Sequence, residues 1–343
     1  MPATLLDVQC VAATGEHLAF TDLTSWCGHY YLAYRQALSH HPMTPGHLVV
    51  RRSPDAVTWD AGVTVHTGGD DRDPHFVCDG ARRLGLMCGT YAYADVPLRT
   101  LHPQVRPQLL LSHVTWSRDG TWWGLPLPLF RWQYWIWSVV PSDGELWRAA
   151  AYHSGDAWDA SSIHYLCSDS GTDWLHAAVI AGPSLDLGEP FLWPAGPKTL
   201  GCLVRHETQP AVLFRATHPY GKWTGTPLEV LVHSPVVRVV GERTFVAGRS
   251  RAEDLPRGVA DAAYRYRKGA KHRYYTTLWE LEGTTLRHLV TVPSAGDCGY
   301  PGLVADPTDD GTLLLSYYSQ HERLPLPAGL PCAADVYVAR IRV

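Results

Sequence analysis

One short pattern occurs three times in this chain, and it restricts the possible folds more than any other feature. Each copy starts at a serine, passes through an acidic or glycine-containing turn and ends at a tryptophan. The copies are Ser53–Trp59, Ser117–Trp122 and Ser168–Trp174. An Asp or Ser side chain can accept hydrogen bonds from the backbone N–H groups of a tight turn, and glycine supplies a positive φ. We therefore expect three equivalent hairpin turns, which is typical of a repeat architecture.

The composition favours strands over helices. Charged residues make up only 18% of the 343 residues, whereas the chain holds 14 Trp, 17 Tyr, 30 Gly and 26 Pro. Aromatic residues are common in strands, and Gly and Pro are common in turns. No long window places apolar residues at helical spacing, and no interdomain linker is visible. The sequence predicts one all-β domain over residues 1–343.

Strand-like runs bounded by turn residues divide the chain into six units of about four strands. The units open at His17, Asp73, Trp135, Glu189, Ser234 and Tyr300. The sixth unit is one strand short, and the N-terminal run 3–12 can supply the missing strand. Pairing the two ends of the chain in this way removes an exposed sheet edge.

The three turns resemble the Asp-box, or BNR, hairpins of sialidase-like β-propellers. Further segments are similar to those of bacterial exo-sialidases and follow one another in the same order. They are Phe20–Leu23, Leu32–Arg35, Asp71–Pro74, Leu203–Arg205, Val246–Arg249, Tyr300–Leu303 and Ser316–Glu322. The resemblance covers nearly the whole chain and implies a six-bladed β-propeller of sialidase type, closed by the N-terminal strand. It also implies a site at the centre of one face, where the first strands converge.

The resemblance also implies a chemistry. In sialidases of this type three arginines bind the sugar carboxylate, a Tyr activated by a Glu attacks the anomeric carbon, and an Asp protonates the leaving oxygen. Guanidinium groups bind carboxylates in a bidentate manner. A neutral tyrosine avoids the repulsion that an anionic nucleophile meets beside an anionic sugar, and the nearby carboxylate accepts its proton.

Four residues match this pattern by their place in the units. Glu189 and Tyr300 open units four and six, and they are the expected base and nucleophile. Arg205 and Arg249 fall where two of the carboxylate-binding arginines are expected. The Arg-Ile-Pro motif expected in the first unit is absent, and Phe20-Thr-Asp stands in its place.

The remaining site residues are less sharply assigned. Arg35 or Arg72 is the candidate to complete the arginine cluster. Asp73 and Asp22 are the candidates for the catalytic acid, and His40, His41 or His47 is an alternative proton donor. Contacts to the sugar are expected from Trp135, in the aromatic run 130–137, and from Tyr318 and His321, because aromatic faces suit the apolar faces of pyranoses.

The sequence thus predicts an exo-glycoside hydrolase that acts on an acidic oligosaccharide with retention, through Glu189 and Tyr300. Two alternatives remain open. One is a lyase that eliminates across a uronate, with Tyr or His removing the proton. The other is a propeller that binds glycans without catalysis, because a fold does not determine a function. Two carboxylates and a Tyr grouped in the pocket favour an enzyme.

Several function classes are disfavoured. The formal charge of −4 argues against a nucleic-acid partner. No Walker loop, dinucleotide fingerprint or Gly-x-Ser-x-Gly elbow occurs. The histidines are scattered, and the adjacent pair His40-His41 falls in an expected loop, so we predict no metal site and no cofactor. Neither a signal-peptide pattern nor a membrane-spanning apolar run is visible, which leads us to expect a soluble cytoplasmic protein without a membrane partner. The oligomeric state stays open.

Overall fold

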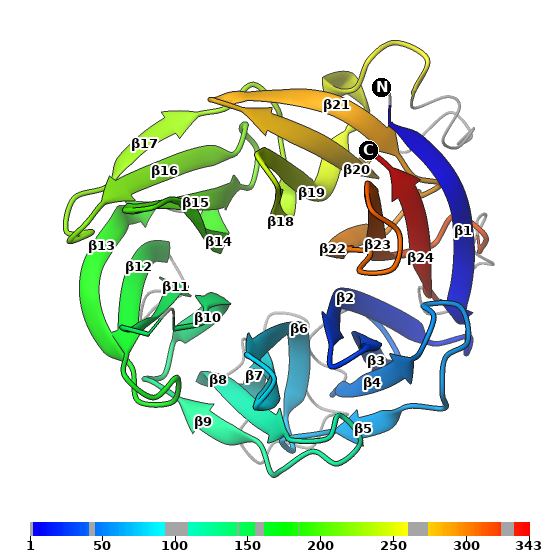
Figure 1. Ribbon diagram of the computed structural model, residues 1–343, viewed down its shortest axis with the longest axis horizontal. Helices are drawn as coiled ribbons and strands as arrows, with labels where there is room; N and C mark the ends of the chain where they lie inside the picture. Colours follow the sequence, from blue (N-terminus) through cyan, green and yellow to red (C-terminus); the bar gives the residue numbers. More distant parts are fainter. Residues whose placement is uncertain are drawn as a thin grey trace, which may run out of the picture.

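Six four-stranded antiparallel sheets surround a central axis like the blades of a propeller (Figure 1). The structure is a computed structural model, and it describes residues 3–40, 45–92, 109–142, 144–154, 161–184, 186–259, 274–323 and 333–343. The innermost strands of the six blades are β2, β6, β10, β14, β18 and β22. The predicted six-bladed all-β propeller is confirmed.

Blades one to three are built from successive strands. Blade one holds β2 (His17–Trp26), β3 (His29–Ala37), β4 (His47–Ser53) and β5 (Val63–Val65). Blade two holds β6 (Asp70–Asp79), β7 (Arg83–Ala92), β8 (Leu109–Ser117) and β9 (Leu127–Leu129). Blade three holds β10 (Tyr134–Val140), β11 (Trp147–His153), β12 (Ser161–Ser168) and β13 (Leu175–Ser184).

Blades four to six continue the pattern. Blade four holds β14 (Leu187–Gly196), β15 (Thr199–His206), β16 (Val212–Thr217) and β17 (Thr224–Pro227). Blade five holds β18 (His233–Val240), β19 (Arg243–Arg251), β20 (Tyr274–Glu282) and β21 (Thr285–Thr291), with the short 3-10 helix η2 (Ala252–Asp254) after β19. Blade six holds β22 (Cys298–Ala305), β23 (Thr312–Ser319), β24 (Asp335–Arg342) and β1 (Thr4–Ala12).

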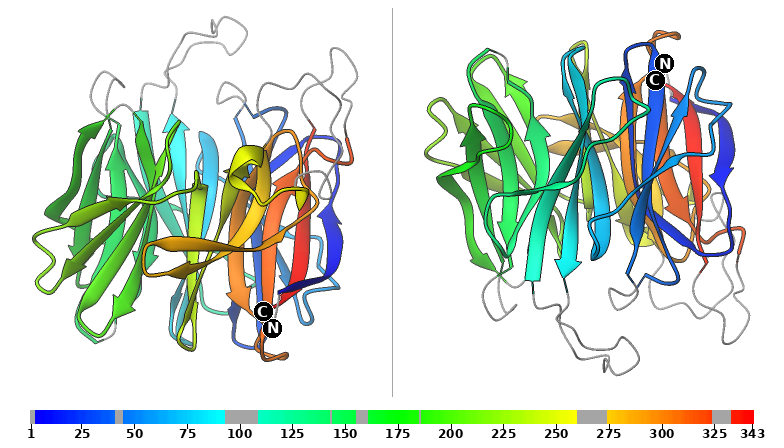
Figure 2. Two further views of the ribbon diagram at one scale, coloured as in Figure 1. Left: turned by 90° about the horizontal axis from the view of Figure 1, so that it is seen from above. Right: turned by 90° about the horizontal axis from the view of Figure 1, so that it is seen from below.

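The two ends of the chain close the ring. Strand β1 pairs antiparallel with β24, from Thr4 opposite Arg342 to Ala12 opposite Val336. Figures 1 and 2 show the N- and C-termini next to each other at this blade. The N-terminal strand therefore covers an edge of β24 that would otherwise expose unpaired backbone groups. The prediction that the N-terminal run completes the sixth blade is confirmed.

The three repeated turns join the third and fourth strands of blades one to three. Asp55 Oδ1 accepts hydrogen bonds from the backbone N–H groups of Val57 and Thr58, at 2.9 and 2.7 Å. Asp119 Oδ1 and Ser170 Oγ accept the equivalent pairs of bonds in the next two blades. These turns lie at the end of the propeller opposite to the starts of the first strands. They hold the hairpins and are remote from the central site.

No segment of the described residues forms a helix long and apolar enough to cross a membrane.

Candidate functional site

All six innermost strands carry a bulge at the same point. The register shifts after Ala19, Arg72, Ile136, Gly188, His233 and Gly299. A bulge leaves an extra residue outside the ladder and redirects its side chain. The bulged residues are Phe20, Asp73, Trp137, Glu189, Ser234 and Tyr300, and all but Glu189 line a small cavity between the blades.

Five of these residues have strained backbones. Phe20, Asp73, Glu189, Ser234 and Tyr300 have φ between 43° and 54°, a region that non-glycine residues rarely adopt. In four blades the next residue is proline, which cannot donate to a ladder and is tolerated at bulges. Such strain persists where the surrounding structure enforces it, and it clusters at functional sites. The repeated bulge thus marks the centre of the propeller as the candidate site.

Glu189 and Tyr300 form a buried pair across this centre. The Tyr300 hydroxyl donates to Glu189 Oε1 at 2.6 Å, and the Ser234 backbone N–H donates to Glu189 Oε2 at 2.6 Å. Burial, followed by the charge of Glu189, raises the pKa of Tyr300 well above its usual value. Tyr300 is therefore neutral at physiological pH, and its proton already points at a carboxylate that can take it.

Two arginines flank the pair. Arg205 Nη1 donates to Glu189 Oε1 and also to the Tyr300 hydroxyl, the latter at 3.3 Å. The Arg249 guanidinium carbon lies 5.9 Å from the centre of the Tyr300 ring. The side chains of Arg205 and Arg249 keep 15% and 14% of their surface exposed, so an anion can reach them.

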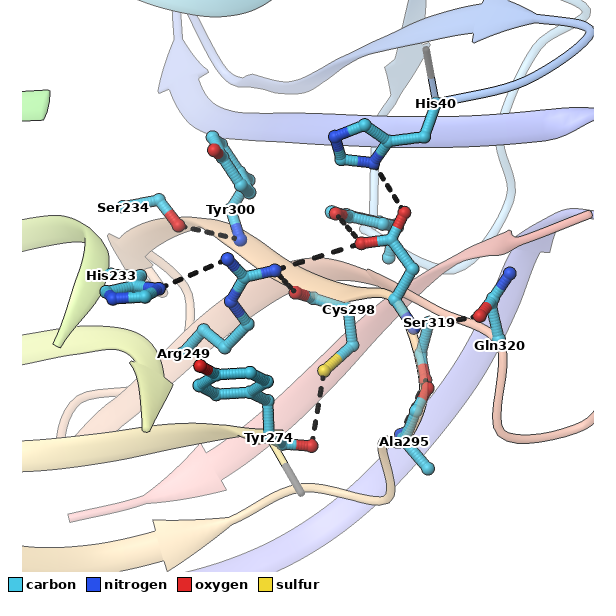
Figure 3. Close-up of polar contacts among 12 residues, drawn as sticks. His40, His233, Ser234, Arg249, Tyr274, Ala295, Cys298, Tyr300, Ser319 and Gln320 are labelled. Atoms are coloured by element: carbon cyan, nitrogen blue, oxygen red, sulfur yellow. Dashed lines mark hydrogen bonds and ion pairs between the residues drawn. The ribbon is translucent and has the colours of Figure 1, made fainter. Parts of the chain in front are cut away.

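His233 orients Arg249, and sequence reasoning missed it. Arg249 Nη2 lies 3.1 Å from His233 Nδ1 (Figure 3). His233 Nε2 lies 3.0 Å from the Glu207 carbonyl oxygen. Burial, followed by the charges of Arg205 and Arg249, lowers the pKa of His233 to about 2. The ring is therefore neutral, with its proton on Nε2, and Nδ1 accepts from Arg249. The recurring X-Pro pair, here Ser234-Pro, was the only signal in the sequence near this position.

Asp73 and Asp22 have different surroundings. Asp73 lines the cavity together with Tyr300, and its Oδ1 is buried without a hydrogen-bond partner among the described residues. Burial raises the pKa of Asp73 to about 7. Asp22 instead accepts the backbone N–H of Phe76 at 2.6 Å, which ties blade one to blade two, and burial raises its pKa to about 6. The structure thus brings Asp73, and not Asp22, to the centre.

Arg35 and Arg72 share one buried counter-ion. Asp70 Oδ1 accepts from Arg35 Nε at 2.8 Å, and Asp70 Oδ2 accepts from Arg72 Nη1 at 3.3 Å. Arg35 and Asp70 are completely buried, so the Arg35 guanidinium is closed off from solvent and pairs with Asp70. The Arg72 guanidinium lies over the Phe20 ring, 4.7 Å from its centre, and this places it next to the cavity.

The predicted sugar contacts are largely packed inside the protein. Trp135 is 2% exposed and stacks on Tyr152 at 5.7 Å, whereas its neighbour Trp137 lines the cavity. Tyr318 is fully buried, 6.2 Å from the Tyr300 ring, and donates to Asp297. His321 packs on Tyr337 of blade six and does not join the group.

Of the alternative proton donors, His41 lies outside the described residues. His47 is partly buried on β4 and packs against the His66 ring at 6.4 Å. His40 pairs with Asp297, a residue that no sequence pattern marks as functional.

Comparison with solved structures matches the fold of this chain to that of several sialidases. A mutant Trypanosoma rangeli sialidase with trans-sialidase activity superposes with a TM-score of 0.65 at 14% identity, over 98% of this chain and 58% of that one. The phage phi92 endosialidase gives 0.61 at 12% identity, over 98% and 69%. The NanB sialidase of Streptococcus pneumoniae gives 0.62 at 9%, over 98% and 70%.

The fold is that of the sialidases. The chain spans 58% of the first of these proteins and 55% of the native T. rangeli sialidase. Other matched structures of the T. rangeli enzyme contain the inhibitor DANA, or 2,3-difluorosialic acid as a covalent intermediate. No family model and no curated protein matches this sequence. The sialidase-like propeller inferred from the turns is confirmed at the level of the fold.

Proposed function

We propose that this protein is a retaining glycoside hydrolase that acts on a sugar bearing a carboxylate. The observation that carries the proposal is the contact of 2.6 Å between the Tyr300 hydroxyl and Glu189, with Arg205 bonded to both. A tyrosine and a carboxylate at strained positions, with an arginine bonded to both, form the arrangement that activates a neutral nucleophile.

In the first step the Tyr300 oxygen attacks the anomeric carbon while its proton passes to Glu189. The glycosidic bond breaks, and Asp73 gives its proton to the leaving oxygen. The raised pKa of Asp73, about 7, keeps this carboxyl group mostly protonated in mildly acidic solution, as a general acid requires. A covalent sugar–tyrosine intermediate results, and the two displacements together retain the configuration.

In the second step a water molecule attacks the anomeric carbon, and the Asp73 carboxylate accepts its proton. Tyr300 leaves and recovers its own proton from Glu189. Arg205 and Arg249 bind the sugar carboxylate throughout, because guanidinium groups suit that anion and retain exposed surface. Arg72, held over Phe20, adds positive charge near the position where the expected first-blade arginine is absent.

The hydrolase fits these observations better than either alternative. A lyase that uses Tyr300 as its base needs the tyrosinate at neutral pH, but burial and Glu189 raise the Tyr300 pKa. A binding module has no need of a hydrogen-bonded Glu–Tyr pair at strained backbone positions.

The test is a panel of acidic oligosaccharides incubated with the protein and followed by proton NMR and ultraviolet absorbance. We expect a released sugar whose first-formed anomer keeps the configuration of the substrate. An unsaturated product assigns the protein to the lyases. Ligand binding without turnover makes it a binding module.

A further inference from the structure

Two histidines and an aspartate converge where blades one and six meet. His17 opens β2, His40 follows β3, and Asp297 precedes β22. His17 Nε2 lies 2.9 Å from Asp297 Oδ2, and His40 Nδ1 lies 2.6 Å from the same oxygen. The three candidate ligand atoms all lie within 4.8 Å of one another. The group is not part of the Glu189–Tyr300 pair.

We propose that His17, His40 and Asp297 bind a divalent transition-metal ion, and Zn²⁺ is the best match. Two imidazoles and one carboxylate suit Zn²⁺ and other divalent transition metals, whereas Mg²⁺ and Ca²⁺ prefer oxygen ligands. Zn²⁺ binds nitrogen and oxygen ligands at about 2.0–2.2 Å, which places the ligand atoms of a tetrahedral site roughly 3.4 Å apart. The contact of 2.9 Å must therefore open by about 0.5 Å and the contact of 2.6 Å by about 0.8 Å to admit the ion. The His40 side chain is 43% exposed and has room to make that shift.

The carboxylate is already oriented for this role. The Tyr318 hydroxyl donates to Asp297 Oδ1 at 2.7 Å, which leaves Oδ2 for the ion, and Gln320 Oε1 accepts the Asp297 backbone N–H at 2.8 Å. Hydrogen bonds of this kind fix a metal ligand in place. His17 Nδ1 is buried without a partner among the described residues, so one outer bond is missing. We therefore expect an affinity about 10- to 100-fold below that of a fully supported site.

The ion would lie beside the residues of the candidate site. The His40 ring lies 5.2 Å from the Phe20 ring, and Arg249 Nη1 lies 3.8 Å from Asp297 Oδ1. Figure 3 shows His40 and Arg249 on the same side of the candidate site. Phe20 occupies the place where the resemblance implies an arginine, and the ion would restore a positive charge beside it. This role toward the substrate rests on the proposed function, whereas metal binding itself does not.

The fold explains why the sequence predicted no metal site. His17 and Asp297 are 280 positions apart, and they meet only because the chain closes into a ring. No local spacing pattern connects them. An ion held by β2 of blade one and the start of β22 would also link the two blades at which the ring closes, so binding would stabilise the native protein.

The experiment measures metal binding by the full chain without any substrate. Chelator-treated protein is titrated with Zn²⁺ by calorimetry and with Co²⁺ by visible absorbance, and its melting temperature is recorded with and without Zn²⁺. We expect one ion per chain, a Co²⁺ spectrum of nitrogen and oxygen ligation, and a higher melting temperature with Zn²⁺. His40→Ala should abolish all three, and Tyr318→Phe should weaken binding about 10- to 100-fold.

The matched control is His66→Ala. The His66 side chain is also 43% exposed, and its Nδ1 lies 2.8 Å from Asp71, so it forms a histidine–aspartate pair outside the proposed cluster. This variant should bind Zn²⁺ as the parent does. The proposal is overturned if the parent binds no stoichiometric ion, or if His40→Ala and His66→Ala reduce binding equally. Neither result depends on whether the protein hydrolyses a sugar.

Discussion

Asp70→Asn should destabilise the propeller strongly, because Asp70 neutralises two arginines inside it. Asp70 and Arg35 have no exposed side-chain surface, and Arg72 has 7%. Asp70 accepts Arg35 Nε at 2.8 Å and Arg72 Nη1 at 3.3 Å, and it also accepts the Gly46 backbone N–H at 2.9 Å. Asparagine keeps the shape but removes the negative charge that both buried guanidinium groups contact.

The expected loss in free energy of unfolding follows from the burial of Asp70 and its two arginines. Removing one partner of a buried ion pair costs about 3–5 kcal/mol, whereas an exposed pair contributes about 0–1 kcal/mol. Asp79→Asn is the matched control, because Asp79 pairs with Arg83 at 2.8 Å and both side chains are 25% exposed. Urea unfolding of the three proteins gives the two differences in free energy of unfolding. If both variants lose less than about 1 kcal/mol, Asp70 does not hold Arg35 in the manner described.

Three predictions concern catalysis, measured on whichever substrate the oligosaccharide panel identifies. Glu189→Gln should lower kcat by about 10²- to 10⁴-fold, and Tyr300→Phe by at least as much, because the base and the nucleophile act together; unchanged kcat in both refutes the pair. Asp73 must be protonated to act as the acid and has a pKa of about 7, so kcat/KM should fall as the pH rises through about 7. Asp73→Asn should remove that decline. If kcat/KM of this variant still falls over the same pH range, another residue is the acid. Arg249→Lys should raise KM about tenfold or more with a smaller change in kcat, since a bidentate contact is lost; an unchanged KM places the sugar carboxylate away from Arg249.

The sequence allowed the architecture to be predicted because the repeat is local. Each turn and each strand start has its own signal, so the six units and the closing strand 3–12 could be placed. Glu189 and Tyr300 could be placed on the innermost strands of blades four and six for the same reason, since each opens its unit in the order that the resemblance implies; their catalytic roles stay predictions. The positive φ at these positions enforces the bulge that turns both side chains toward the centre.

Contacts between blades could not be predicted. Arg35 and Arg72 were alternatives to complete the arginine cluster, and a strand pattern does not reveal that Asp70 of the next blade pairs with Arg35. Asp22 was an equal candidate to Asp73 until the Phe76 backbone was seen to occupy its carboxylate. Asp297 and its histidines had no local signal, since they meet only across the closure of the ring.

The most direct test of the central claim is to trap the intermediate on the enzyme. A fluorinated analogue of the identified substrate, which slows the second step, is incubated with the protein, and the labelled peptide is found by mass spectrometry. The account predicts one sugar per chain attached to Tyr300, and no label in Tyr300→Phe. A sugar attached to Glu189 or Asp73, or steady hydrolysis of the natural substrate by Tyr300→Phe, would contradict it.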